Sequence, residues 1–204
     1  MKEFVNFDEF YDVQASLTSL LQALESVNQQ PLLWKQVILS THSALQGSCA
    51  CILTRTDGGG ALDKNSEERL YWYHKNQTDI AIAQQKGAET PEEMVYPQLE
   101  MQGLPGLLRR LPDNLTVDIP KNFENCSDAD VQDFWRLHDW RNSFTHFQII
   151  DWSIEIAGLP RIVLNALQLI EKIILSDSYH RRNRFYDTDV SDLLLRCTRA
   201  CEKL

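Results

Sequence analysis

Apolar residues recur at helical spacing through most of this 204-residue chain. In residues 8–27, DEFYDVQASLTSLLQALESV, they fall every three or four positions, which predicts an α-helix with one buried face. Residues 31–54 and 160–176 are apolar on more than one side, which predicts two central helices. Pro31 and Pro160 suit the first turns of these helices, where no backbone N–H is needed. Because no segment alternates like a strand between hairpin turns, the sequence predicts an all-α fold.

Two further helices are expected over residues 66–87 and 188–202. Ser66 is a candidate N-cap for the first of them, and Gly87 is a candidate stop. The expected architecture is a bundle of four to five helices with extra short helices, formed by a single domain over residues 1–204.

Two segments interrupt the helical pattern. Residues 55–65 are glycine-rich and predict a loop; they are no phosphate-binding fingerprint, because no strand precedes the glycines and no Lys-Ser/Thr follows them. Residues 90–125 hold five of the seven prolines. We expect them to form an irregular insertion or connection, packed over the bundle or acting as a lid, with short helices near 92–102 and 104–111.

The formal net charge of −9 argues against a protein that coats nucleic acid regardless of sequence, because phosphate contacts need clustered Lys and Arg. It is compatible with a local basic pocket. No apolar run approaches the roughly 18 residues of a membrane span. The N-terminus lacks the apolar core of a signal peptide. We therefore expect a cytoplasmic protein without membrane contact.

The five cysteines are an odd number in a chain without an export signal, which argues against a disulfide framework. Cys49 and Cys51 with Cys197 and Cys201 could supply four metal ligands. Neither pair has the two-residue gap of common zinc knuckles. We expect buried or partly buried free thiols, and neither a metal nor a cofactor.

The segment that points to chemistry is residues 127–150, SDADVQDFWRLHDWRNSFTHFQII, expected as one helix with Ser127 as its N-cap. At 100° per residue, an apolar stripe falls within an arc of about 80°; it comprises Leu137, Trp140, Phe144 and Phe147. The facing arc is polar, and comprises His138, Arg141, Asn142, Thr145 and His146. A plain surface helix would more often present Glu and Lys there. This polar face is the candidate site.

The run Arg141-Asn142-Ser143-Phe144-Thr145-His146 resembles the signature of the HEPN superfamily. That signature is an Arg, usually a polar residue, three or four further residues and then a His, on an inner helix of an all-α bundle. The resemblance implies a metal-independent endoribonuclease that acts as a homodimer, such as a toxin–antitoxin or phage-defence effector. In such families the Arg/His sets of two protomers meet in one composite cleft.

The resemblance also implies roles for single residues. His146 would act as general base or acid on ribose oxygens, and Arg141 would hold the scissile phosphate. Asn142, one turn before His146, would orient it or bind phosphate. The products would carry a 2′,3′-cyclic phosphate and a 5′-hydroxyl. Because Arg141 and His146 are about 140° apart on a helix, a second helix or protomer must complete the site.

Four residues complete the candidate substrate-binding set: His138 and Thr145 on the same helix, and Arg181 and Arg182 in the strongest basic cluster. We expect this cluster in a turn, where it is either a solvated loop or a phosphate contact. In one branch of the family a modified Tyr stands two residues after the His. Gln148 occupies that place here, which argues against control by a nucleotidyltransferase, whereas an antitoxin or another protein partner remains an expectation.

A non-catalytic HEPN-like domain that binds RNA, a nucleotide or a partner protein is the alternative. The adjacent aromatic residues 71–73 favour a protein interface, because they cannot all face one core. An HD-type phosphohydrolase is a third idea, based on the pair His138-Asp139. It needs a further His and Asp as metal ligands; the candidates are His42 or His74 with Asp177 or Asp187, and no spacing recommends them. Otherwise His42 is expected to be a core or interface histidine.

Overall fold

The computed structural model describes residues 8–115, 128–146, 153–183 and 190–204, without the side chains of residues 130, 182 and 183. Within these ranges the chain is helical and contains no strand, which confirms the predicted all-α helical bundle. The helices are α1 (Glu9–Ser26), η1 (Pro31–Leu33), α2 (Trp34–Leu53), α3 (Lys64–Lys86), α4 (Leu104–Leu108), α5 (Ala129–Thr145), α6 (Leu159–Ile174), α7 (Asp177–Asn183) and α8 (Ser191–Cys201).

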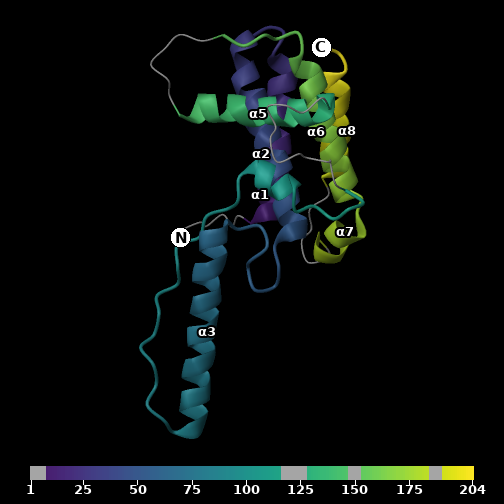
Figure 1. Ribbon diagram of the computed structural model, residues 1–204. Coiled ribbons are helices and arrows are strands. Elements are labelled where there is room, and N and C mark those ends of the chain that lie inside the picture. The colour runs from purple at the N-terminus through teal and green to yellow at the C-terminus, as the bar shows by residue number, and fades with distance from the viewer. Residues whose placement is uncertain (1–7, 116–127, 147–152, 184–189) are drawn as a thin grey trace, which may run out of the picture. The chain divides into compact units, whose positions relative to one another are not determined.

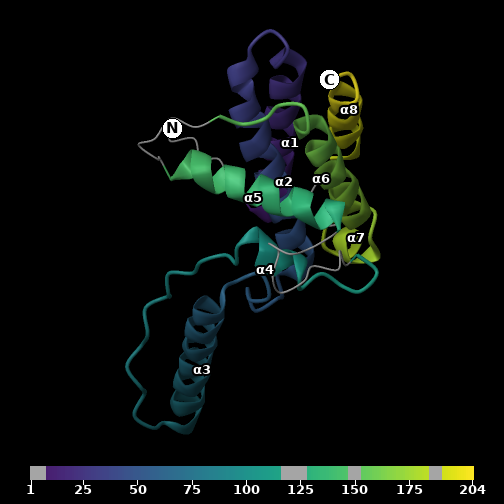
Figure 2. The ribbon, with the colours of Figure 1, turned by 45° about the horizontal axis from the view of Figure 1, so that its top comes forward.

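The chain divides into two compact units. Unit 1 combines residues 1–52 with 104–204, and unit 2, residues 53–103, is inserted between these two segments. In unit 1, α6 packs against α5 and α8, and α8 also packs against α1. Figures 1 and 2 show α5 running across α1 and α2. The candidate site therefore lies wholly within unit 1.

The expected starts of three helices in unit 1 are confirmed. Asp8 caps α1, because its Oδ1 accepts hydrogen bonds of 2.9 Å from the backbone N–H groups of Phe10 and Tyr11. Pro31 opens the short 3₁₀ turn that leads into α2. Pro160 lies in the first turn of α6. The last helix, α8, also lies within its expected range.

Helix α5 differs from its predicted form at its C-terminal end. It ends at Thr145, so His146 lies just beyond the helix instead of within it. The expected cap Ser127 and residues 147–150 lie outside the described residues. The buried face is also shifted toward the N-terminus: Val131, Phe134 and Leu137 are buried. Trp140 and Phe144, which were expected in the core, are only half-buried.

A buried carboxylate joins α5 to α6 and explains part of this shift. Asp133 is 1% exposed and accepts hydrogen bonds from Arg161 at 2.8 Å and Asn165 at 2.7 Å. Arg161 also forms an ion pair of 2.6 Å with Asp133. These contacts hold the N-terminal half of α5 against α6, so that its apolar side chains there are buried. Burial is the largest influence on the pKa of Asp133 and raises it, while Arg161 opposes that effect.

The long helix of unit 2, α3, begins at Lys64, earlier than predicted. Asp63 is its N-cap, because Asp63 Oδ1 accepts from the backbone N–H of Ser66 at 2.6 Å. The assignment of Ser66 as the cap was wrong: its hydroxyl accepts from Arg69 and from the Glu100 backbone N–H. Gly87 ends α3 with a φ of 62°, as expected of a helix stop.

The short helix expected near residues 92–102 does not form. Asn76 instead binds the start of this segment, since the Asn76 amide donates to Glu92 O and accepts from Met94 N, both at 3.0 Å. Near the end of unit 2, Leu62 and Met101 form an antiparallel bridge. The other expected short helix is confirmed in part as α4, which covers the first five residues of the range 104–111.

The basic cluster was expected in a turn, yet Arg181 lies within helix α7. The four cysteines in the described ranges are buried and free, as predicted, while Cys126 lies outside those ranges. Burial raises the pKa of Cys49, Cys197 and Cys201 to about 12, so these thiols stay protonated at neutral pH. None of the described helices is long and apolar enough to cross a membrane.

Candidate functional site

Two histidines from distant parts of the chain meet where α5 crosses α2. His42 Nε2 lies 3.1 Å from His138 Nδ1, within hydrogen-bond distance. Their rings are stacked, with centroids 5.3 Å apart and planes 25° from parallel. His42 is 2% exposed, and His138 is half-buried. The interpretation of His42 as a buried core histidine is thus confirmed, but its partner is a candidate site residue.

The contact continues along α5 toward the surface. Asn142 Nδ2 lies 3.2 Å from His138 Nε2, and Arg141 Nη1 donates to Asn142 Oδ1 at 3.0 Å. The four side chains form one chain of hydrogen bonds, which we call the histidine relay: Arg141, Asn142, His138 and His42. Three of its members belong to the polar face identified in the sequence.

The guanidinium group fixes the direction of every hydrogen bond in the relay. Arginine only donates, so the Asn142 oxygen must face Arg141 and its NH₂ must face His138. His138 Nε2 is then an acceptor without a proton, and its proton lies on Nδ1. His138 Nδ1 therefore donates to His42 Nε2. Both rings are neutral in this arrangement, with the protons on Nδ1.

The electrostatic surroundings favour the same neutral state. Burial, and then the neighbouring His138 and Arg141, lower the pKa of His42 from 6.5 to about 3. Burial and Arg141 also lower the pKa of His138, while Asp139 acts in the opposite direction. A proton on His138 Nε2 would face the Asn142 NH₂ group, so protonation would require that amide to turn away from Arg141.

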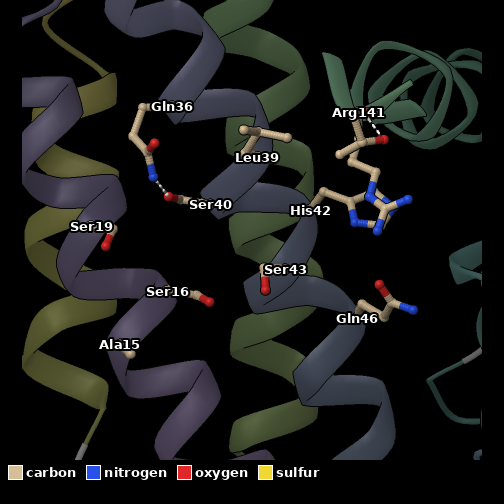
Figure 3. A pocket seen from close by; sticks show the side chains of 11 residues that line it. Ala15, Ser16, Ser19, Gln36, Leu39, Ser40, His42, Ser43, Gln46 and Arg141 are labelled. Atoms are coloured by element: carbon tan, nitrogen blue, oxygen red, sulfur yellow. Dashed lines mark hydrogen bonds between the residues drawn. The ribbon is translucent and has the colours of Figure 1, made fainter. Parts of the chain in front are cut away.

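A groove of about 360 Å³ lies beside the relay, between α1, α2 and the end of α5. We call it the serine groove. It is lined by Ala15, Ser16, Ser19, Gln36, Leu39, Ser40, His42, Ser43, Gln46, Arg141 and Thr145. Figure 3 shows the serines of α1 and α2 on its two walls and Arg141 descending from α5 beside His42. The groove thus brings a guanidinium group together with several hydroxyl and amide groups.

The residues of the predicted polar face lie in different surroundings. Arg141 and Thr145 line the serine groove. The Thr145 hydroxyl donates to the backbone carbonyls of Arg141 and Asn142, at 3.0 and 3.1 Å. His146 is exposed beyond the end of α5, although its backbone N–H still donates to Asn142 O at 2.9 Å. The Asn142 amide contacts Arg141 and His138, and in the described structure His146 is not among its partners.

The basic cluster is separate from the serine groove. Arg181 is exposed on α7, which packs against α6, and donates to Ser178 Oγ at 3.4 Å. It does not line the groove. The Arg182 side chain lies outside the described residues. Nothing in the described geometry joins Arg181 to the candidate site on α5.

Reasoning from the sequence missed the polar residues of the groove. Ser16 and Ser19 on α1, with Ser40 and Ser43 on α2, recur at helical spacing and could have indicated a polar face on each helix. Their neighbours are apolar, and that apolar pattern led us to predict only packing.

The described residues offer no group of three or more His, Cys, Asp or Glu side chains arranged for a metal ion. Asp187, one of the Asp candidates for an HD-type site, lies outside the described residues. No protein-family model matches the sequence, and comparison with curated proteins and with solved structures finds no match either. The site is therefore interpreted from its own chemistry.

Proposed function

We propose that this protein is a HEPN-like, metal-independent endoribonuclease that acts as a homodimer, of the kind found in toxin–antitoxin or phage-defence systems. The observation that carries the proposal is the Arg141 guanidinium group, held by Asn142 at the wall of a polar groove. His146 follows on the same end of α5 and is exposed to substrate. These are the Arg, Asn and His of the signature-like run.

The reaction we propose divides the work between these side chains. His146 accepts the proton of a ribose 2′-hydroxyl while the 2′-oxygen forms a bond to phosphorus. The bond from phosphorus to the 5′-oxygen breaks, and that oxygen receives a proton from the protonated His146 of the second protomer. Arg141 stabilises the negative charge that accumulates on the phosphoryl oxygens. The products are a 2′,3′-cyclic phosphate and a 5′-hydroxyl.

The other two histidines of unit 1 near α5 are poor candidates for the general base. His42 is buried, and its low pKa of about 3 makes it a weak proton acceptor. His138 Nε2 already accepts from Asn142. We therefore assign His42 and His138 a positioning role. They orient Asn142, and Asn142 in turn orients Arg141. Thr145, Arg181 and Arg182 remain proposed contacts to RNA.

The nuclease proposal is tested with purified wild-type protein and total RNA from several sources, in EDTA. We expect wild-type protein to cleave RNA, and His146→Ala and Arg141→Lys to lose activity by about 100-fold or more. Two matched controls make the same substitutions away from the proposed RNA contacts: His74→Ala on α3 and Arg196→Lys on α8, both exposed. Intact RNA with wild-type protein, or full cleavage by His146→Ala, would contradict the proposal.

The composite site is tested by mixing the two inactive variants. If Arg141 of one protomer works with His146 of the other, a dimer of Arg141→Lys with His146→Ala keeps one such Arg/His pair and lacks the second His146, which supplies the proton to the leaving oxygen. Mixing then restores part of the activity. If both residues act within one protomer, mixing restores nothing, and the dimeric site is wrong even though the nuclease stands.

A non-catalytic domain that binds RNA, a nucleotide or a partner protein is the second candidate. It is favoured by one observation: Asn142 is engaged within the protein by His138 and Arg141. This alternative predicts RNA binding without cleavage, unchanged in His146→Ala.

A further inference from the structure

Two polar stripes line the serine groove. On α1, Ser16 and Ser19 line the groove, and Asp12, which does not line it, falls one turn before Ser16 on the same face of the helix. On α2, Gln36, Ser40, Ser43 and Gln46 follow the same spacing. The stripes approach each other where Ser43 Oγ donates to Asp12 Oδ2 at 3.4 Å. Asp12 and Gln36 are exposed to solvent, whereas Ser16 and Ser40 are buried. Facing helices of a packed bundle normally carry apolar side chains at buried positions, so these two serines suit a polar ligand.

One of the serines that line this groove is largely buried as a residue, and its hydroxyl faces the groove. Ser16 is 8% exposed, and in the described part of the chain its Oγ forms no hydrogen bond. Figure 3 shows its hydroxyl directed into the groove, toward the wall formed by α2. Ser40, also buried, accepts from Gln36 Nε2 at 2.8 Å. A hydroxyl that opens onto a groove can donate to a bound polar ligand and accept from it.

The charge of the groove indicates the charge of the ligand that it would bind. Among the described residues that line the groove, Arg141 is the one charged side chain, because His42 is neutral at pH 7. The Asp12 carboxylate, which accepts from Ser43, does not line the groove. In the described structure its side chain donates through Nη1 to Asn142, and its remaining N–H groups are available to the groove. Figure 3 shows the guanidinium group beside His42 at the groove wall. Such a group suits a phosphate, which it can bind through two parallel hydrogen bonds.

We propose that the serine groove binds one nucleotide unit of RNA, with the phosphate on Arg141 and the ribose and base edges on the Ser and Gln side chains. The inference rests on the proposed nuclease function for RNA as the source of the nucleotide. The groove volume of about 360 Å³ lies at the small end of ligand pockets, which suits one unit rather than a strand. The chain's net charge of −9 also favours recognition at one local site over extended phosphate contacts.

Calorimetric titration of the full chain provides a test that needs no cleavage. The probes are the four nucleoside 3′-phosphates, the corresponding nucleosides and inorganic phosphate. We expect at least one nucleoside 3′-phosphate to bind about tenfold or more tightly than its nucleoside and than inorganic phosphate. Equal affinity for inorganic phosphate would overturn the nucleotide assignment, and so would the absence of binding by every probe.

Two variants test the groove itself. Ser19→Leu fills it from α1, where the side chain is half-buried, and is expected to weaken nucleotide binding by about tenfold or more. Ser16→Ala removes the unpartnered hydroxyl without adding bulk, and is expected to weaken binding by about two- to tenfold. Thr18→Leu adds bulk on the exposed side of the same helix and is the matched control. Circular dichroism and thermal unfolding confirm that each variant is folded.

The two proposals fail separately. If wild-type protein cleaves RNA and Ser19→Leu raises KM with little change in kcat, the groove is a substrate subsite. If Ser19→Leu cleaves with unchanged KM and binds nucleotides as the wild type does, the groove assignment is wrong and the nuclease stands. If the nucleotide binds to the wild type and not to Ser19→Leu, yet RNA is never cleaved, the groove assignment stands and the nuclease is wrong.

Discussion

His138 donates a hydrogen bond from Nδ1 to Nε2 of His42, 3.1 Å away, and Arg141 sets the direction of that bond through Asn142. The result is an ordered polar connection between the wall of the serine groove and the buried middle of α2. The protonation of each side chain in the relay depends on its neighbour, so a substitution at one of them should change the measured protonation of the next.

Replacing Asn142 with Asp should reverse the protonation of His138. A carboxylate accepts from Arg141 and also from His138, so His138 Nε2 would have to carry a proton. In wild-type protein, ¹⁵N NMR of the imidazoles should find His138 protonated on Nδ1. In Asn142→Asp it should find protonation on Nε2, or on both nitrogens, with a raised pKa. Asn142→Ala serves as the control without a new charge, and an Nε2-protonated His138 in the wild type would contradict the relay.

Stability should fall as the pH falls below about 6.5, because of His42. Its pKa is lowered from 6.5 to about 3 on folding, so between these values the unfolded chain binds a proton that the folded chain does not. The contribution of neutral His42 to stability is therefore complete above pH 6.5, the pKa in the unfolded chain, and is lost progressively as the pH falls toward about 3, the pKa in the folded chain. The expected loss from pH 6.5 to pH 5 is about 2 kcal/mol. Urea unfolding across this range measures it, and His42→Gln should show a flatter profile; an equal slope in both proteins would contradict the assignment.

The ion pair between α5 and α6 should respond unequally to loss of its two partners. Asp133 is 1% exposed, whereas the Arg161 side chain is 51% exposed. Arg161→Ala leaves a buried carboxylate with Asn165 as its remaining partner among the contacts described here, which should cost about 3 kcal/mol. Asp133→Asn leaves an arginine that water can solvate, which should cost about 1 kcal/mol. Urea unfolding of both variants decides the order, and a larger loss for Asp133→Asn would contradict it.

Two glycines of unit 2 should differ in their tolerance of a methyl group. Gly60 and Gly87 both have positive φ, of 93° and 62°. A Cβ at Gly60 would lie 2.0 Å from Leu53 O, whereas a Cβ at Gly87 meets nothing within 4 Å. Gly87→Ala should cost about 1 kcal/mol from backbone strain alone. Gly60→Ala should cost about 3 kcal/mol or more, because the backbone must move to make room for the Cβ. Thermal unfolding of the two variants compares the losses of stability. Equal losses would contradict the prediction that the contact with Leu53 O adds a cost at Gly60.

The helices were predictable because burial repeats along the chain. The apolar periodicity of residues 8–27 reflects the face of α1 that the bundle covers, and Pro31 and Gly87 act through local backbone geometry. The cap of α3 was misassigned because Asp63 and Ser66 are both suitable cap residues. The Ser66 hydroxyl instead accepts from Arg69 and from the backbone of Glu100, and the second contact, remote in sequence, could not be predicted.

The polar face on α5 was predictable from the sequence, but the hydrogen bonds between its side chains were not. His42 and His138 are 96 positions apart, and nothing local marks a buried histidine on α2 as the partner of one on α5. The sequence pattern therefore paired Asn142 with His146, one turn away, although its amide contacts His138, one turn in the other direction. Side chains at i−4 and i+4 are equivalent in a helical projection, and only the packing of α2 distinguishes them.

The pairing of residues 61–63 with 100–102 has a consequence for how this chain can change over time. Backbone hydrogen bonds of 3.0 Å from Asp63 to Glu100 and 2.9 Å from Gln102 to Ala61 join the two ends of the segment that holds α3. Residues 64–99, which include α3, are thereby closed into a loop within unit 2. A change in the length of α3 is therefore expected to be absorbed within residues 64–99, while α5, the helix that carries Arg141, keeps its packing against α6.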